Sequence, residues 1–270
     1  MIITSKDPQG FQTQAIEVTP YAGGINITPT GTPVDFTIMQ LRRRACSPSI
    51  PGKFANLGVS AQIHLTLQGL EYLLLVRQQK KEHSVLKLPS GYVPIEQLSN
   101  PWLTLAQELA EECLLLEGKQ FGRCLLNDRK IVKPYPELDY HDSLQMAFTS
   151  EVYNPLDLPQ AKVCIGQKPL AGHPMLYIHK QTCSAQLVYP LRLELPDSDT
   201  LSLLHAEEQF NATSNQLDVV MNTELWLAQL KDGRIRQLNK LIRGKVQPIK
   251  APADTRLSEV FAPRQPVTQV

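Results

Sequence analysis

A hairpin signal in the first half of the chain places the strongest constraint on its fold. The runs VSAQIHLTL and LEYLLLVRQ are strand-like, and Gln68-Gly69 separates them. A two-residue connection containing glycine is typical of a β-hairpin, because glycine adopts positive φ at little cost. We therefore expect residues 59–67 and 70–78 to form two paired strands.

A clearly punctuated helix follows this hairpin. Asn100 suits the N-cap position and Pro101 the first helical position. Apolar residues then recur at helical spacing from Trp102 to Leu116, which indicates one buried face. The helix is expected to end at Gly118, since glycine is common at helix C-termini.

Strand-like runs surround this helix, and two more helices are expected near the C-terminus. Residues 34–44 (VDFTIMQLRRR) are predicted as a strand, 199–210 as a short helix, and 223–235 as a helix that ends near Gly233. The order of strands, helix, strands and helices predicts an α+β fold, an α/β/α sandwich around one mixed sheet.

Three regions are predicted along the chain. Residues 1–55 form a β-rich N-terminal extension, residues 56–234 the main domain, and residues 235–270 an extended, proline-containing tail.

Charge and cysteine content exclude several functional classes. The chain of 270 residues has a formal net charge of +1, so no global field favours nucleic acid or a membrane surface as partner. It has five cysteines and no C-x-x-C pair, which disfavours a disulfide framework and fits reduced thiols in a cytoplasm. No window holds 18 consecutive apolar residues, so no membrane span is expected.

Three glutamates on the predicted helix point to metal chemistry. Glu108, Glu111 and Glu112 are spaced i, i+3 and i+4, so they share one helix face and repel one another. A divalent cation would relieve this repulsion, and Mg²⁺ prefers such oxygen ligands. Gly91, in the preceding loop, would let the backbone approach the same site.

The stretch LPSGYVPIEQLSNPWLTLAQELAEECLLLEG resembles a Nudix box, G-x5-E-x7-R-E-U-x-E-E-x-G-U, in which U is aliphatic. Its second half is matched by QELAEECLL, and LPSG resembles the L-P-G-G that commonly precedes the helix in that family. Gly91 would then be the box glycine. The resemblance implies a Nudix-like fold over residues 56–234.

The departures from the pattern fall on scaffold positions. The loop is two residues longer than the pattern, Gln97 replaces the loop glutamate, with Glu96 beside it, and Gln107 replaces the arginine. In the family these two residues form an ion pair; here a neutral Gln–Gln or a Glu–Gln hydrogen bond is expected. Leu114 stands at the last glycine position. The three helix carboxylates are retained.

The resemblance implies a Mg²⁺- or Mn²⁺-dependent hydrolase of nucleoside diphosphates linked to another moiety, such as nucleotide sugars or ADP-ribose. Glu108 and Glu112 would be the main metal ligands. Glu111 would be a ligand or help to activate the water, and the Gly91 backbone would supply a further ligand.

The general base in this family often lies outside the box. Glu207 and Glu208 in HAEEQF are the candidates here, and the competing interpretation is a solvated helix face.

Arginines outside the box are candidates for binding substrate phosphates, because their guanidinium forks suit that geometry. In a strand, Arg42 and Arg44 would share one face and Arg43 the other. Arg77 follows the strand that leads to the box. The competing interpretation of the arginine run is a charged sheet edge that discourages strand pairing.

Two classes of function therefore remain. One is the hydrolase of a small nucleoside diphosphate derivative. The other is a catalytically weakened Nudix-like module that binds a nucleotide or a protein, favoured by the changed scaffold positions. The N-terminal extension would shape the substrate pocket or pair with a second subunit in a homodimer.

Overall fold

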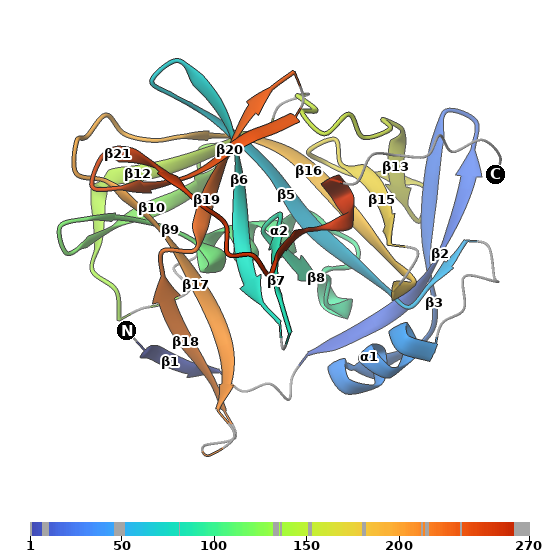
Figure 1. The fold of residues 1–270 in the computed structure, drawn as a ribbon. Coiled ribbons are helices and arrows are strands. Elements are labelled where there is room, and N and C mark those ends of the chain that lie inside the picture. Colours follow the sequence, from blue (N-terminus) through green and yellow to red (C-terminus); the bar gives the residue numbers. More distant parts are fainter. Residues whose placement is uncertain are drawn as a thin grey trace.

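The computed structural model describes residues 2–6, 11–45, 52–80, 82–131, 135, 137–150, 153–179, 182–211, 213, 216–232 and 234–261. Within these ranges the chain is built mainly of strands, with two α-helices, α1 (Phe36–Ala45) and α2 (Pro101–Glu112). The strands form one large sheet and one small sheet (Figure 1).

The large sheet contains strands from most of the chain. They are β1 (Ile2–Lys6), β5 (Asn56–Leu67), β6 (Leu70–Gln79), β7 (Ser84–Lys87), β8 (Ser90–Tyr92), β9 (Cys113–Glu117), β10 (Gln120–Leu126), β11 (Arg129–Lys130), β12 (Tyr140–Ser150), β15 (Met175–His179), β16 (Ser184–Glu194), β17 (Ser202–Asn211), β18 (Gln216–Asn222), β19 (Leu225–Lys231), β20 (Arg234–Ile242), β21 (Lys245–Ile249) and β22 (Thr255–Leu257). The small sheet contains β2 (Gln12–Tyr21), β3 (Gly24–Asp35), β4 (Lys53–Phe54), β13 (Lys162–Ile165) and β14 (Lys168–Pro169).

Strand β5 is the centre of the large sheet. It pairs in parallel with β16 and antiparallel with β6 and β8. On one side the sheet continues through β12, β10 and β9 to β17, and on the other through β19 to β20. Helix α2 contacts β5 and β8 as well as β9 and β17. Because these strands belong to distant parts of one sheet, the sheet curls around α2 (Figure 1).

The core lies between the curled sheet and α2. Leu105 and Leu109 of the helix are almost fully buried and pack in one cluster with Val59 and Ile63 of β5. Burial of side chains of this size contributes about 1.5–3 kcal/mol each to folding. The helix face that carries the glutamates is therefore held at a fixed place beside β8.

The predicted α/β/α sandwich is wrong, because the described residues contain no second helical layer. Residues predicted as the 199–210 helix form most of β17, and those predicted as the 223–235 helix form all of β19 and the start of β20. The first four residues of β19, LWLA, are all buried. A continuous apolar run does not distinguish a central strand from a buried helix by its period. Gly233, the expected helix end, lies outside the described residues.

The strand predicted for residues 34–44 is also wrong, because most of this run forms α1. Asp35 caps the helix: its Oδ1 accepts a hydrogen bond from the Ile38 N–H at 2.8 Å. Arg42, Arg43 and Arg44 occupy the last turn, where cations are favoured by the helix dipole. The arginines are thus arranged around a helix instead of alternating along a strand.

The hairpin prediction is confirmed. Strands β5 and β6 pair in antiparallel register up to Leu67 and Leu70, and both Gln68 and Gly69 have positive φ. The predicted start of α2 at Pro101 is also confirmed. Its predicted end at Gly118 is wrong: the helix stops at Glu112, and the next residues form β9, which pairs with β17 and β10.

The two ends of the chain contribute to the sheets. The small sheet joins β2, β3 and β4 to β13 and β14 from the middle of the chain, and β1 pairs with β18. From the predicted tail, β21 and β22 join the large sheet, and residues 262–270 lie outside the described part. No helix in the described ranges is long and apolar enough to cross a membrane. The four described cysteines are free thiols.

Candidate functional site

The carboxylate of Glu108 lies against the backbone of Gly91. A Cβ atom placed on Gly91 would overlap both carboxylate oxygens of Glu108. Strand β8 can therefore approach α2 this closely only because residue 91 has no side chain. The sequence predicted that this glycine and the helix glutamates would meet, and the structure places them together.

Glu112 lies at the open edge of the same strand. Its Oε2 accepts a hydrogen bond from the Ser90 N–H at 3.1 Å, and its Oε1 is 3.9 Å from Lys87 Nζ. Lys87 in turn donates to Ser90 Oγ at 2.9 Å. The side chains of Lys87 and Glu112 are only 20% and 18% exposed, so water screens this pair weakly.

The Gly91 carbonyl points toward the edge of β8 that pairs with β5, away from Glu112. The neighbouring ladder bonds, Ala61 N–H to Pro89 O and Val93 N–H to Leu57 O, show that alternate residues of this strand face β5. Gly91 is opposite Val59 in that register, so its carbonyl faces β5 while Ser90 faces the glutamates. The contribution of Gly91 to the site is the space it leaves for Glu108.

Glu108 and Glu112 have raised pKa values. Burial is the main cause for Glu108, followed by the charges of Glu112 and Glu111, and together they hold its pKa well above its usual range. Burial also raises the pKa of Glu112, although Lys87 and the Ser90 N–H oppose this effect. Carboxylates that repel one another in a poorly solvated place favour a proton or a cation.

Glu207 and Glu208 lie on β17, the strand that faces α2 from the other side of the curl. Their charges reach the helix glutamates: Glu207 helps to raise the pKa of Glu112, and Glu208 that of Glu108. Burial raises the pKa of Glu207 itself. The predicted helix here is wrong, but β17 does bring both candidate bases within electrostatic range of the site.

Of the two hydrogen bonds expected at the scaffold positions, Gln–Gln or Glu–Gln, the Gln–Gln bond is present. Gln97 Nε2 donates to Gln107 Oε1 at 2.7 Å, and Gln97 Oε1 accepts from Thr104 Oγ1 at 2.6 Å. Gln97 therefore ties the loop to the first two turns of α2 without any charge. This neutral link occupies the place where the family pattern has an ion pair.

We expect the fold to accept, in place of this Gln–Gln bond, the Glu–Arg ion pair of the Nudix box pattern. In a double-mutant cycle of Gln97→Glu and Gln107→Arg, each single variant should lose stability, because one charged side chain lacks its partner. The double variant should recover about 0.2–1 kcal/mol of coupling in urea unfolding, the range for exposed ion pairs. A coupling of zero would contradict the contact between the two side chains.

The predicted phosphate-binding arginines are separated in the structure. Arg44 lines a pocket beside β8, whereas Arg42 and Arg77 do not. Arg77 donates to Ser84 Oγ at 2.7 Å and lies 3.5 Å from Glu224, so its charge is already paired.

Sequence reasoning missed three residues near the site. Lys87 pairs with Glu112, and Lys80 and Tyr92 line the same pocket as Arg44. Arg43 also lines this pocket, although the strand prediction placed it on the face opposite to Arg44. The Asp35 cap is the signal that would have placed Arg43 on a helix and toward this pocket.

The described residues contain no group of three or more histidine, cysteine, aspartate or glutamate side chains arranged to hold a metal ion. The donor set nevertheless suits Mg²⁺: Glu108 and Glu112 offer carboxylate oxygens, and Mg²⁺ keeps several waters beside one or two such ligands. Comparison of the chain with protein-family models, with curated proteins and with solved structures finds no match.

Proposed function

We propose that this protein is a Mg²⁺-dependent hydrolase of the Nudix type. Its substrate would be a nucleoside diphosphate linked to another moiety, such as a nucleotide sugar or ADP-ribose, and the reaction would cleave the pyrophosphate. The observation that carries the proposal is the pair of partly buried carboxylates, Glu108 and Glu112, packed against Gly91 and Ser90. Their placement fits the ligand positions of the box that the sequence resembles.

Glu108 and Glu112 would hold the metal, with Glu111 on the same helix face. When bound, Mg²⁺ would neutralise pyrophosphate charge and orient the attacking water. The Ser90 N–H fixes the carboxylate of Glu112, and the bare backbone at Gly91 leaves room for that of Glu108. Lys87, beside Glu112, would stabilise negative charge that develops on the phosphate.

We assign proton abstraction to Glu207. Burial raises its pKa, which brings it closer to the working pH and makes it a stronger base than an exposed glutamate. It projects from β17 in the electrostatic neighbourhood of Glu112. Replacement by glutamine removes the base and keeps the size of the side chain.

The alternative is a module that binds a nucleotide or a protein without hydrolysis. The ion pair between Lys87 and Glu112 favours it, because Lys87 already balances part of the charge that a metal would balance. Such a module would be stabilised by its ligand in the absence of metal.

A phosphate-release screen tests the proposal. Nucleotide sugars, ADP-ribose, dinucleoside polyphosphates, coenzyme A and nucleoside triphosphates would be offered with Mg²⁺, with Mn²⁺ and with EDTA, using a phosphatase to reveal phosphomonoester products. We expect metal-dependent turnover of at least one diphosphate-linked compound. Thermal stabilisation by ADP-ribose in EDTA, with no turnover under any condition, would instead support the binding module.

A further inference from the structure

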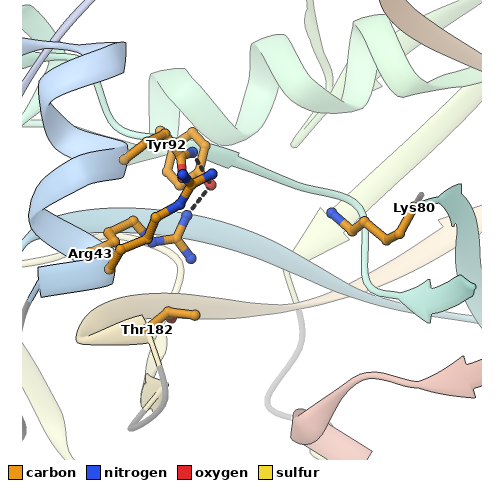
Figure 2. Close-up of a pocket in the computed structure, with 6 residues that line it drawn as sticks. Arg43, Lys80, Tyr92 and Thr182 are labelled. Carbon is orange, nitrogen blue, oxygen red and sulfur yellow. Dashed lines mark hydrogen bonds between the residues drawn. The ribbon is translucent and has the colours of Figure 1, made fainter. Parts of the chain in front are cut away.

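A second polar site lies on the face of β8 opposite to the one that Glu108 contacts at Gly91. It is a pocket of about 350 Å³, lined by Gln40, Arg43, Arg44, Lys80, Tyr92 and Thr182. This volume lies in the range of small-ligand sites. Figure 2 shows the side chains of Arg43 and Lys80 extending into the pocket from opposite sides. Helix α1, from the N-terminal part of the chain, thus forms one wall of the pocket.

Three cations line this pocket, and none of its lining residues is acidic. Arg43 is held in place by Tyr92: its Nη1 donates to the Tyr92 hydroxyl, and its guanidinium carbon lies 5.3 Å from the ring centroid. The buried Nε of Arg43 has no hydrogen-bond partner within the described part of the chain. Lys80 completes the cluster, and burial, followed by the charges of Lys87 and Arg43, lowers its pKa. An anion in the pocket would relieve this repulsion.

The pocket also has a neutral wall suited to an organic group. The ring of Tyr92 lies 5.7 Å from that of Phe36, centroid to centroid, and the Phe36 side chain is 43% exposed. Gln40 and Thr182 add neutral hydrogen-bonding groups. An anion attached to a sugar or a base would therefore find both charge and contact area here.

The position of the pocket limits which anion of a substrate could reach it. Ser90, which binds Glu112, and Tyr92, which lines the pocket, are two residues apart on β8, roughly 7 Å along the strand. Their side chains point to the same face, while the Ser90 N–H points to the edge where Glu112 lies. One small anion cannot occupy both places, but a ligand with two separated phosphate groups can.

We propose that this pocket binds a phosphomonoester of the substrate, separate from the pyrophosphate that is cleaved. The identification of the ligand as the substrate rests on the proposed function, whereas the binding of phosphate by the pocket does not. Two guanidinium groups favour phosphate, because their planar forks match its oxygens. The preferred substrates are then diphosphate-linked compounds that carry an additional terminal phosphate.

A binding experiment tests the pocket without catalysis. Inorganic phosphate would be titrated in EDTA and followed by ³¹P NMR, so that metal-dependent binding at the glutamates does not contribute. Arg44→Ala/Lys80→Ala removes two exposed side chains and should weaken binding by roughly tenfold or more, because charge-assisted hydrogen bonds are lost. Arg42→Ala is the matched control: it removes a charge from α1 that does not line the pocket. Equal losses in both variants, or no binding by the unmodified protein, would overturn the assignment.

A comparison of substrates tests the link to hydrolysis. Coenzyme A with dephospho-coenzyme A, and NADPH with NADH, are pairs that differ by one phosphomonoester. The phosphorylated member should have the higher kcat/KM, and this preference should disappear in Arg44→Ala/Lys80→Ala. Hydrolysis without any preference would reject the pocket as a substrate site and leave the proposed function intact. Phosphate binding that depends on Arg44 and Lys80, without hydrolysis of any compound, would reject the proposed function and leave the pocket intact.

Discussion

Replacing Glu108 by glutamine is expected to abolish metal-dependent turnover and at the same time to stabilise the fold at pH 8. The loss of activity should reach about 10³-fold, since a ligand that holds charge at the reacting phosphate is removed. The gain in stability follows from the pKa of Glu108, which burial and the neighbouring glutamates raise well above its usual range. The charged form is disfavoured in the folded state, so glutamine removes a destabilising charge.

The sign of this effect depends on pH. Glu108 takes up its proton at a higher pH in the folded than in the unfolded protein, so its contribution favours folding below the unfolded pKa and is lost as pH rises through the folded pKa. The variant should therefore be more stable by about 1 kcal/mol or more at pH 8, and the difference should vanish near pH 4. Thermal unfolding should show a rise of about 2–4 °C per kcal/mol for a chain of this size.

Glu96→Gln is the matched control for Glu108→Gln. Glu96 is an exposed glutamate in the loop that precedes α2, so the same chemical change is made away from the carboxylate cluster. It should change neither turnover nor the pH dependence of stability. If Glu108→Gln remained active, or if it lost stability at pH 8, the Glu108 carboxylate would not have the role assigned here.

Acid should destabilise the protein through His205 on β17. This side chain is 3% exposed, and burial, followed by the charge of Lys87, lowers its pKa to about 3. The unfolded chain binds a proton near pH 6.5, so stability from this group is complete above that pH and is lost as pH falls toward 3. Between pH 7.5 and pH 5 the loss from this one residue amounts to about 2 kcal/mol.

The comparison of the unmodified protein with His205→Gln isolates this contribution. The raised pKa values of Glu108 and Glu112 change the free energy of unfolding in the opposite direction as the pH falls. The pH dependence of stability measured on one protein alone is therefore the sum of these contributions. Urea unfolding of both proteins at pH 7.5 and pH 5 should show a difference in stability that shifts by about 2 kcal/mol in favour of the variant at pH 5. A difference that is the same at both values would mean that His205 is protonated, or accessible to water, in the folded protein.

Local signals predicted the parts of the site that depend on short stretches of chain. The Gln68-Gly69 turn and the start of α2 at Pro101 depend on residues close in sequence. The bond between Gln97 and Gln107 was expected from the resemblance to the Nudix box. The approach of Glu108 to Gly91 followed from a loop and a helix that are consecutive along the chain. These features need no knowledge of the rest of the fold.

The errors lie where pairing between distant strands decides the structure. LWLA in β19 is buried on both faces, because Leu225 and Leu227 pack in one core cluster and Trp226 and Ala228 in another. Its edges pair with β6 and β20, and neither partner can be read from its own residues. β17 similarly takes its extended form between β9 and β18. Tertiary pairing outweighed helical propensity in both segments. Because these two segments form strands and not helices, the structure is a sheet that curls around α2 and not the expected sandwich.

The pocket could not be predicted because the residues of α1 were expected to form a strand and not a helix. Arginines at consecutive positions were placed on alternate faces of a strand, which left Arg43 apart from Arg44. On a helix both residues reach the same pocket, which Lys80, directly after β6, and Tyr92 of β8 also line. The Asp35 side chain, which caps α1, is the local evidence for the helix.

Metal binding in the absence of substrate tests the central claim most directly. Mn²⁺ would be titrated into the protein at pH 8 and the free ion followed by electron paramagnetic resonance, for the unmodified protein, the variant Glu108→Gln/Glu112→Gln and the control Glu96→Gln. The account predicts one site that is present in the unmodified protein and in the control and is lost in the double variant. Equal Mn²⁺ binding by all three proteins, or none by the unmodified protein, would contradict a metal-dependent site at these carboxylates.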